Sequence, residues 1–182
     1  MLEGAPAADL RSTVGSPGVG ESKTLFRIPL RDAERLAAEV MKKIKGAVKR
    51  YDIAGSIRRK KSDIGDVDVV VVPKSVGALK SELTKLSQNV WGGQKLLNMV
   101  YKDRQFNFVI TDDNAYGAAL MHTTGSAQYN IGLRSKAKKL GYKLNQYGLI
   151  DVNTGDIIAS KTEDDIYKAL GRDKPRPPEQ RG

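Results

Sequence analysis

Two aspartates stand beside the most β-branched stretch of the sequence. Asp66 and Asp68 are separated by one residue, and residues 67–72, which contain the second of them, predict a strand. Side chains two positions apart in a strand point the same way, so both carboxylates should project from one face. They repel each other unless a divalent cation lies between them, and oxygen ligands suit Mg²⁺. The pair therefore predicts a magnesium site; the plain alternative is an acidic turn before a buried strand.

A glycine–serine turn lies shortly upstream of this pair. Gly55 and Ser56 are followed by Arg58 and Arg59, and Gly65 directly precedes the aspartates. Such a turn lets backbone N–H groups approach an anion, while Ser56 and Arg59 add side-chain donors. Together with the aspartates, the turn predicts a site at a sheet edge for a triphosphate bridged by Mg²⁺.

The composition favours a polyanionic partner. The 182 residues hold 31 Lys and Arg against 21 Asp and Glu, and this net charge of +10 indicates nucleic acid or an anionic membrane surface. With 40% hydrophobic residues, the chain is expected to be globular. The absence of cysteine excludes disulfides, thiolate nucleophiles and cysteine-bound zinc, and fits a cytoplasmic location, with a nucleoid or nuclear one also open. The only histidine, His122, excludes a histidine-rich metal site.

The sequence predicts no membrane span, because its longest aliphatic run, residues 67–72, is far too short to cross a bilayer. The amino-terminal residues are rich in Gly, Ala, Ser and Pro and lack the apolar core of a signal peptide. We expect residues 1–26 to form a flexible leader.

Periodicity predicts the elements that must position these motifs. Apolar residues recur every four positions from Leu36 to Val48, which predicts a helix with Asp32 as its N-cap that runs to about residue 51. The basic stretch 126–140 predicts another helix, which ends before Gly141. The other predicted elements are strands at 51–54, 67–72, 96–100, 105–110, 143–145 and 148–151, helices at 77–88, 115–121 and 163–170 (with Thr162 and Asp165 as a capping box), and an irregular tail after Gly171. This order predicts an α+β fold with two small subdomains.

Several segments combine into a more specific pattern. They are Gly-Ser-x-Arg-Arg at 55–59, Gly-Asp-x-Asp at 65–68, His-Thr-Thr-Gly-Ser at 122–126 with Asn130 and Arg134 after it, and the segments 141–149 and 162–178. In this order they resemble the family X DNA polymerases, the group of DNA polymerase beta. The resemblance extends over about residues 27–181, without an amino-terminal lyase domain or helix-hairpin-helix modules, as in minimal members of that family.

The resemblance implies a fold and an activity. The α+β fold would consist of a nucleotidyltransferase-type palm at 27–114, with a small mixed sheet and helices on one side, and a small α/β thumb or fingers subdomain at 115–182. The activity would be template-directed transfer of deoxynucleotides from their triphosphates to a primer 3′-OH, suited to filling short gaps in DNA repair. The implied protein is a monomer that uses two Mg²⁺ ions, for which Mn²⁺ can substitute, and that acts on gapped or primer–template DNA.

The resemblance also assigns residues to roles. The catalytic metal ligands fall on Asp66, Asp68 and Asn107. The nucleotide-binding positions fall on Gly55, Ser56, Arg59, Gly65, His122, Thr123, Gly125 and Asn130. The DNA-binding positions fall on Arg134, Lys136, Lys138 and Lys139, in a basic helix whose charges suit a phosphate backbone and which would otherwise be a solvated face.

Position 107 departs from the family pattern, which has a carboxylate there. The amide of Asn107 is neutral, so it is a weak ligand for a hard cation and cannot act as a general base. Asp103 falls in a turn and Asp112 has the opposite strand parity, so neither is expected to replace it. Asparagine for aspartate is also the isosteric change used to trap substrate complexes, and we favour an engineered inactivation over a natural variant. Two other readings stay open: a catalytically silent nucleotide- and DNA-binding module, and a template-independent nucleotidyltransferase.

Two further departures concern the nucleotide. His122 and Thr123 stand where the family usually has two aromatic residues against the incoming sugar. The smaller Thr123 predicts weak discrimination against ribonucleotides, whereas His122 could simply be a structural residue between the subdomains. Ala127 stands where an acidic residue that packs on the incoming base is common.

Overall fold

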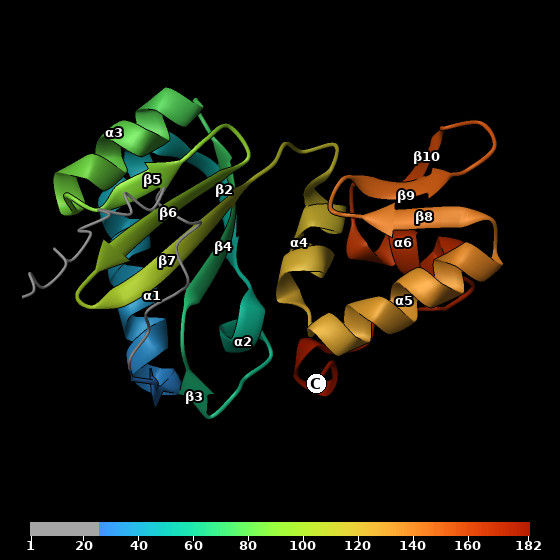
Figure 1. Ribbon diagram of the computed structural model, residues 1–182, viewed down its shortest axis with the longest axis horizontal. Coiled ribbons are helices and arrows are strands. Elements are labelled where there is room, and N and C mark those ends of the chain that lie inside the picture. Colours follow the sequence, from blue (N-terminus) through green and yellow to red (C-terminus); the bar gives the residue numbers. More distant parts are fainter. Residues whose placement is uncertain (1–25) are drawn as a thin grey trace, which may run out of the picture.

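The computed structural model describes residues 26–182 as two compact units side by side (Figure 1). The predicted leader, residues 1–26, lies outside the described residues except for Phe26. Within the described part, no helix combines the length and apolar character needed to cross a membrane.

A five-stranded mixed sheet forms the centre of the first unit. Its order is β2-β4-β7-β6-β5; β4 and β7 are parallel and the other neighbours are antiparallel. The strands are β2 (Val48–Ile53), β4 (Val67–Pro73), β5 (Val90–Gly92), β6 (Leu96–Tyr101) and β7 (Arg104–Ile110). Two short strands, β1 (Ile28–Pro29) and β3 (Asp63–Ile64), pair separately. The predicted mixed sheet is confirmed, and the β-branched run forms an inner strand, β4, between β2 and β7.

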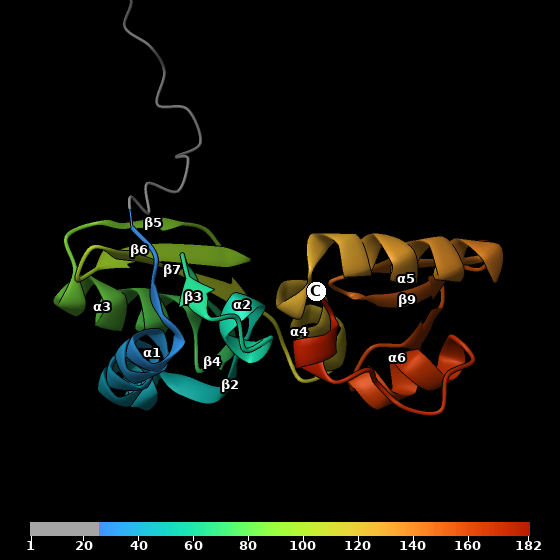
Figure 2. The ribbon, with the colours of Figure 1, turned by 90° about the horizontal axis from the view of Figure 1, so that it is seen from below.

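Two helices cover one face of this sheet. Helices α1 (Leu30–Ile44) and α3 (Val76–Leu86) lie together on that face (Figure 2). Alternate residues of β4 and β7, including Val69 and Phe108, are fully buried in the core beneath them. Each such side chain contributes about 1.5–3 kcal/mol by leaving water.

The predicted first helix began too late and ended too late. Its N-cap is Pro29, without a side-chain bond, and Asp32 lies in the first turn. At the other end α1 stops at Ile44, a short 3₁₀ turn (Lys45–Ala47) follows, and β2 begins at Val48. The four-residue apolar spacing continues past this point, but backbone pairing with β4 determines the conformation there.

The second unit packs three helices with a three-stranded sheet of order β10-β9-β8. Its elements are α4 (Tyr116–Thr124), α5 (Ala127–Lys139), β8 (Tyr142–Asn145), β9 (Gly148–Asp151), β10 (Ile157–Ala159) and α6 (Glu163–Ala169). As predicted, the Thr162 hydroxyl caps α6 by accepting a hydrogen bond from the Asp165 N–H at 3.1 Å. Helix α5 lies along β8, and α6 lies beside α4 and β10.

Sequence patterns missed several short elements of the chain. Strands β3, β5 and β10 and the one-turn helix α2 (Gly55–Arg58) were not predicted. Helix α4 continues to Thr124, so it includes His122 and Thr123. The tail is not irregular throughout, because a 3₁₀ turn (Pro178–Gln180) brings Arg181 into the interior, where it is only 1% exposed.

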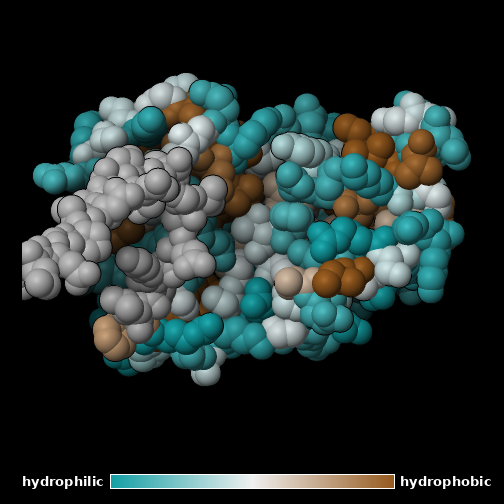
Figure 3. All heavy atoms as spheres, in the orientation of Figure 1, coloured by the Kyte–Doolittle hydropathy of each residue, from teal (hydrophilic) through white to brown (hydrophobic). Residues whose placement is uncertain are grey.

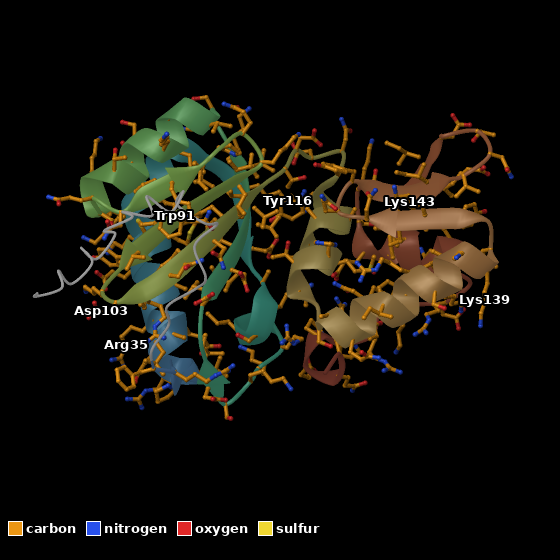
Figure 4. All side chains as sticks on the ribbon, viewed as in Figure 1. Arg35, Trp91, Asp103, Tyr116, Lys139 and Lys143 are labelled. Carbon is orange, nitrogen blue, oxygen red and sulfur yellow. The ribbon has the colours of Figure 1, made fainter. Side chains whose placement is uncertain are left out.

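Helix α4 joins the two units through Tyr116. The Tyr116 hydroxyl donates to Asp52 of β2 at 2.6 Å, and the Arg50 guanidinium lies 3.5 Å above the tyrosine ring. Burial and the bond to Asp52 raise the pKa of Tyr116. Figure 4 shows Tyr116 where the chain passes from the sheet to the second unit. This packing fixes α4 against the sheet face that α1 and α3 leave uncovered.

Candidate active site

A cavity of about 900 Å³ is lined by residues of both units. The predicted site residues on its wall are Gly55, Ser56, Arg59, Gly65, Asp66, Asp68, His122, Thr123, Gly125, Asn130 and Arg134. Four other predicted residues, Asn107, Lys136, Lys138 and Lys139, are not part of the lining. The sequence prediction missed the lining residues Arg27, Lys61 and Asp63, of which only Lys61 had a signal, its place in the basic loop.

The glycine–serine turn packs directly on an aspartate of β4. Gly55 has φ +56°, and a Cβ atom there would lie 2.1 Å from Oδ2 of Asp68. The Ala54 N–H donates to the Asp68 carbonyl at 2.8 Å, so the backbone fixes the same approach. Only glycine combines this conformation with this contact, which explains its place in the motif.

The two aspartates share the cavity wall. Burial raises the pKa of Asp68, and the negative charge of Asp66 adds to this, while the hydrogen bond from Asn107 and the charge of Arg59 oppose it. A bound cation would offset the same burial and repulsion. Among residues 26–182, no three His, Cys, Asp or Glu side chains are grouped to hold a metal ion. The donor set of two carboxylates therefore fits a Mg²⁺ ion that takes further oxygens from a phosphate ligand.

Asn107 lies next to Asp68 on the neighbouring strand. The two residues are register partners in the parallel β4–β7 pair, and Asn107 Nδ2 donates to Asp68 Oδ1 at 2.9 Å. On its other side, Asn107 Oδ1 accepts a hydrogen bond from Gln105 Nε2 at 2.8 Å. The structure thus brings position 107 to the aspartates, although its role as a ligand stays a prediction.

Arg59 links the first unit to the turn between α4 and α5. Its Nη1 donates to the Thr124 carbonyl at 2.6 Å and its Nε to the Gly182 carbonyl at 3.1 Å. Burial lowers the pKa of Arg59, and the charge of Asp68 opposes that shift. Gly125, with φ +69°, lets the turn pass close to Arg59, since a Cβ there would lie 3.2 Å from Nη1.

An ion-pair network that the sequence did not predict supports this turn from behind. Glu163, at the start of α6, accepts two bonds from Arg58 at 2.8 and 2.9 Å and two from Arg181 at 2.9 and 3.3 Å. Arg58 Nη1 also donates to the Thr124 hydroxyl at 2.8 Å. Because Arg58 is the neighbour of Arg59, the network fixes the arginine that lines the cavity.

The opposite wall carries the remaining residues assigned to the nucleotide, those of α4 and α5 and the turn between them. Asn130 Nδ2 donates to the His122 carbonyl at 2.8 Å, which ties α5 to α4. Burial, with a smaller effect of the Arg134 charge, lowers the pKa of His122 and favours the neutral imidazole. Within the described residues, the Thr123 hydroxyl oxygen is buried without a hydrogen-bond partner.

The basic helix α5 extends away from the cavity. Asn130 and Arg134 lie on the wall, whereas Lys139 lies at the far end of the helix (Figure 4). Lys138 and Lys139 are exposed and Lys136 is half-buried. The surface over α5 is mostly hydrophilic, with one apolar patch (Figure 3). This arrangement suits contact with an extended polyanion at the mouth of the cavity.

Comparisons with known proteins match both units. The family description "DNA polymerase beta palm" matches residues 27–129, and "DNA polymerase beta thumb" matches residues 119–182. The chain therefore belongs to the DNA polymerase beta family, that is, family X of the DNA polymerases. The predicted family and the predicted fold class are confirmed by this match.

Three relatives illustrate the range of the family. The chain is 31% identical over 140 residues to "Repair DNA polymerase X" of African swine fever virus (isolate Tick/South Africa/Pretoriuskop Pr4/1996), which covers 70% of this chain and 79% of the viral protein. It is 26% identical over 153 residues to "DNA polymerase/3′-5′ exonuclease PolX" of Bacillus subtilis, covering 80% of this chain and 27% of that protein. It is also 26% identical over 149 residues to "DNA polymerase lambda" of Rattus norvegicus, covering 64% of this chain and 26% of the rat protein. The chain thus spans about a quarter of the bacterial and rat proteins and most of the viral one.

Proposed function

We propose that this chain is a template-directed DNA polymerase that adds nucleotides to a primer 3′-OH in short gaps during DNA repair, with its rate reduced by Asn107. One observation carries the proposal. The glycine–serine turn and both aspartates of the first unit line the same cavity as Thr123, Gly125 and Arg134 of the second. A triphosphate and a primer end would therefore meet between two carboxylates and a cluster of cationic groups.

Different residues on the wall bind different parts of the nucleotide and the DNA. Ser56 and Arg59 hold the triphosphate, and Arg59 is oriented for this by its bond to the Thr124 carbonyl. Thr123 and Gly125 lie against the sugar, and Asn130 against the base. Arg134 and the lysines of α5 hold the DNA backbone, so affinity for DNA falls as salt is added.

Family X polymerases are generally metal-dependent. In this chain, Asp66 and Asp68 would hold one Mg²⁺ with the triphosphate, and both aspartates with position 107 would hold a second. Bound there, the ions neutralise phosphate charge and lower the pKa of the primer 3′-OH. Asn107 contributes a neutral oxygen at most, which weakens the second position and removes a candidate base for the 3′-OH proton. Mn²⁺ can substitute for Mg²⁺ in this proposal.

Primer extension on a one-nucleotide gap tests the proposal. We expect slow extension by the native chain with Mn²⁺ and a gain of about 10²-fold or more in Asn107→Asp, because a carboxylate can act as ligand and base. The matched control is Asn98→Asp: Asn98 pairs with Asn107 across β6 and β7, so the same charge enters one strand further from Asp68. The control should show no comparable gain.

Two outcomes favour the alternatives. If neither the native chain nor Asn107→Asp extends the primer but both bind nucleotide and DNA, the protein is a silent binding module. If extension proceeds equally on single-stranded primer without template, it is a template-independent nucleotidyltransferase.

Ribonucleotide use is a finer part of the proposal. Thr123 lines the cavity and is smaller than an aromatic residue, so it leaves more room beside the sugar. Matched ribo- and deoxyribonucleotides should differ by less than about 10³-fold in kcat/KM, and Thr123→Phe should widen that difference. A native selectivity above about 10³ contradicts this part alone.

A further inference from the structure

Gln105 and Asn107 form an amide pair beside Asp68. The two residues lie two positions apart in β7, so their side chains point to the same face of the sheet. Gln105 Nε2 donates to Asn107 Oδ1 at 2.8 Å, and Asn107 Nδ2 donates to Asp68 Oδ1 at 2.9 Å. The hydrogen bonds therefore run in one direction, from Gln105 through Asn107 to the aspartate.

The carboxylate sets this direction. An ionised Asp68 only accepts hydrogen bonds, so Asn107 must turn its NH₂ group towards it and its oxygen away. Gln105 must then present its own NH₂ group, because two amide oxygens facing each other would leave half-buried acceptors without a donor. Each amide orientation thus depends on the next group along the chain.

A divalent cation bound to Asp68 would require Asn107 to present its oxygen instead of its NH₂ group. Cations bind oxygen lone pairs, whereas Asn107 directs N–H groups at the aspartate in this structure. To offer Oδ1 instead, the Asn107 amide must turn over, and its NH₂ group then points at Gln105. Gln105 can accept that bond only if its own amide turns over too, which glutamine allows because it carries both a donor and an acceptor.

We infer that Gln105 is a positioning residue that sets which atom of Asn107 faces Asp68 and so tunes the affinity of the site for a divalent cation. The inference rests on the proposed function, in which Asp66 and Asp68 hold that cation. Gln105 lies outside the residues that line the cavity, so its effect passes through Asn107.

The substitution Gln105→Glu should favour one of the two orientations of the Asn107 amide. A carboxylate at this position can only accept, so it favours the Asn107 orientation that offers Oδ1 to a cation. It also adds a negative charge, which attracts any cation through space. The same substitution in an Asn107→Ala background keeps the charge and removes the amide to be oriented. The change in Mn²⁺ affinity caused by Gln105→Glu is therefore compared in the two backgrounds. As in a double-mutant cycle, the ratio of the two changes measures the contribution of the hydrogen bond between residues 105 and 107.

Mn²⁺ binding gives a readout that does not depend on catalysis. Each protein is titrated with Mn²⁺ alone, and the free ion is followed by its electron paramagnetic resonance signal. Gln105→Glu should tighten Mn²⁺ binding in both backgrounds. The gain in affinity should be about tenfold larger when Asn107 is present than in Asn107→Ala, which is equivalent to about 1.4 kcal/mol of coupling between the two residues. Equal factors in the two backgrounds overturn the role of Gln105.

A third variant tests the proposed metal site separately from the role of Gln105. Asp66→Ala should abolish Mn²⁺ binding at the site in the native background. If Mn²⁺ binds Asp66→Ala as tightly as the native chain, the proposed metal site is wrong, and the inference is overturned with it. If Asp66→Ala loses Mn²⁺ and the two Gln105→Glu factors are equal, only the role of Gln105 is wrong.

Discussion

Arg58 and Glu163, 105 positions apart in the chain, form a two-point ion pair with bonds of 2.8 and 2.9 Å. The pair joins the glycine–serine turn to the start of α6, and its side chains are 21% and 10% exposed. Arg181 completes the network from the carboxy-terminal tail. A buried network of this kind holds the two units in one arrangement, and its members are costly to lose one at a time.

The first prediction is that Glu163→Gln destabilises the protein by about 3 kcal/mol, because the half-buried Arg58 and the buried Arg181 lose their shared carboxylate while the side chain keeps its volume. Urea unfolding followed by circular dichroism measures the change. Glu82→Gln is the control: Glu82 pairs with Lys85 at 2.6 Å on the exposed side of α3, where an ion pair contributes less than about 1 kcal/mol. Equal losses in the two variants would show that the Glu163 network carries no special stability.

The second prediction concerns the pH dependence of that stability. Burial alone would raise the pKa of Glu163, but the hydrogen bonds from Arg58 and Arg181 outweigh it and lower the pKa below its ordinary value. The folded state therefore holds this proton more weakly than the unfolded state, so the stabilisation is complete above the unfolded pKa, about 4.3, and is lost as pH falls through the lower folded value.

Comparison with the glutamine variant measures this dependence. The gap in unfolding free energy between the native chain and Glu163→Gln should be constant from pH 7 to about pH 5 and should shrink below about pH 4. A gap that widens on acidification would contradict the lowered pKa of Glu163.

The site was predictable where local patterns determine geometry. Strand parity placed Asp66 and Asp68 on one side, and both line the cavity, although β4 begins only at Val67. The position of Asn107 beside them was also foreseeable, since a neighbouring strand with apolar alternation brings its polar residue to the same row. Gly55 was singled out for another reason, the approach of backbone N–H groups to an anion, and its packing on Asp68 became apparent only in the structure.

The parts that were missed depend on long-range contacts. The tail residue Arg181 carries no local periodicity, and its burial follows from its ion pair with Glu163, which is 18 positions away and also binds Arg58 of the other unit. Similarly, helical spacing continued to Val48 while pairing with Pro73 made that residue a strand. The engineered origin of Asn107 and the division of the chain at residues 114 and 115 stay predictions.

The third prediction is that Gly55→Ala damages both the fold and the site. The new Cβ would overlap Oδ2 of Asp68, and the residue would keep a positive φ that costs an alanine about 1–2 kcal/mol. We expect a loss of at least about 2 kcal/mol in stability and weaker Mn²⁺ binding, because Asp68 must move. Gly77→Ala is the matched control, since Gly77 lies in α3 with open space around its Cα; it should be neutral or stabilising by up to about 1 kcal/mol. A Gly55→Ala protein as stable as Gly77→Ala would refute the close packing on Asp68.

The fourth prediction concerns DNA binding by the exposed Arg134, which lies on the cavity wall at the start of the basic stretch of α5. If its guanidinium contacts a phosphate, Arg134→Ala should weaken binding to a gapped duplex uniformly across sequences. The slope of log K against log salt should also become shallower by about 1, because one fewer counterion is released. Fluorescence anisotropy from 50 to 200 mM salt gives the slope. Lys80→Ala removes an equal charge from the exposed side of α3, so its slope should stay that of the native chain. If both variants lower the slope equally, net charge governs DNA binding and α5 has no special part in it.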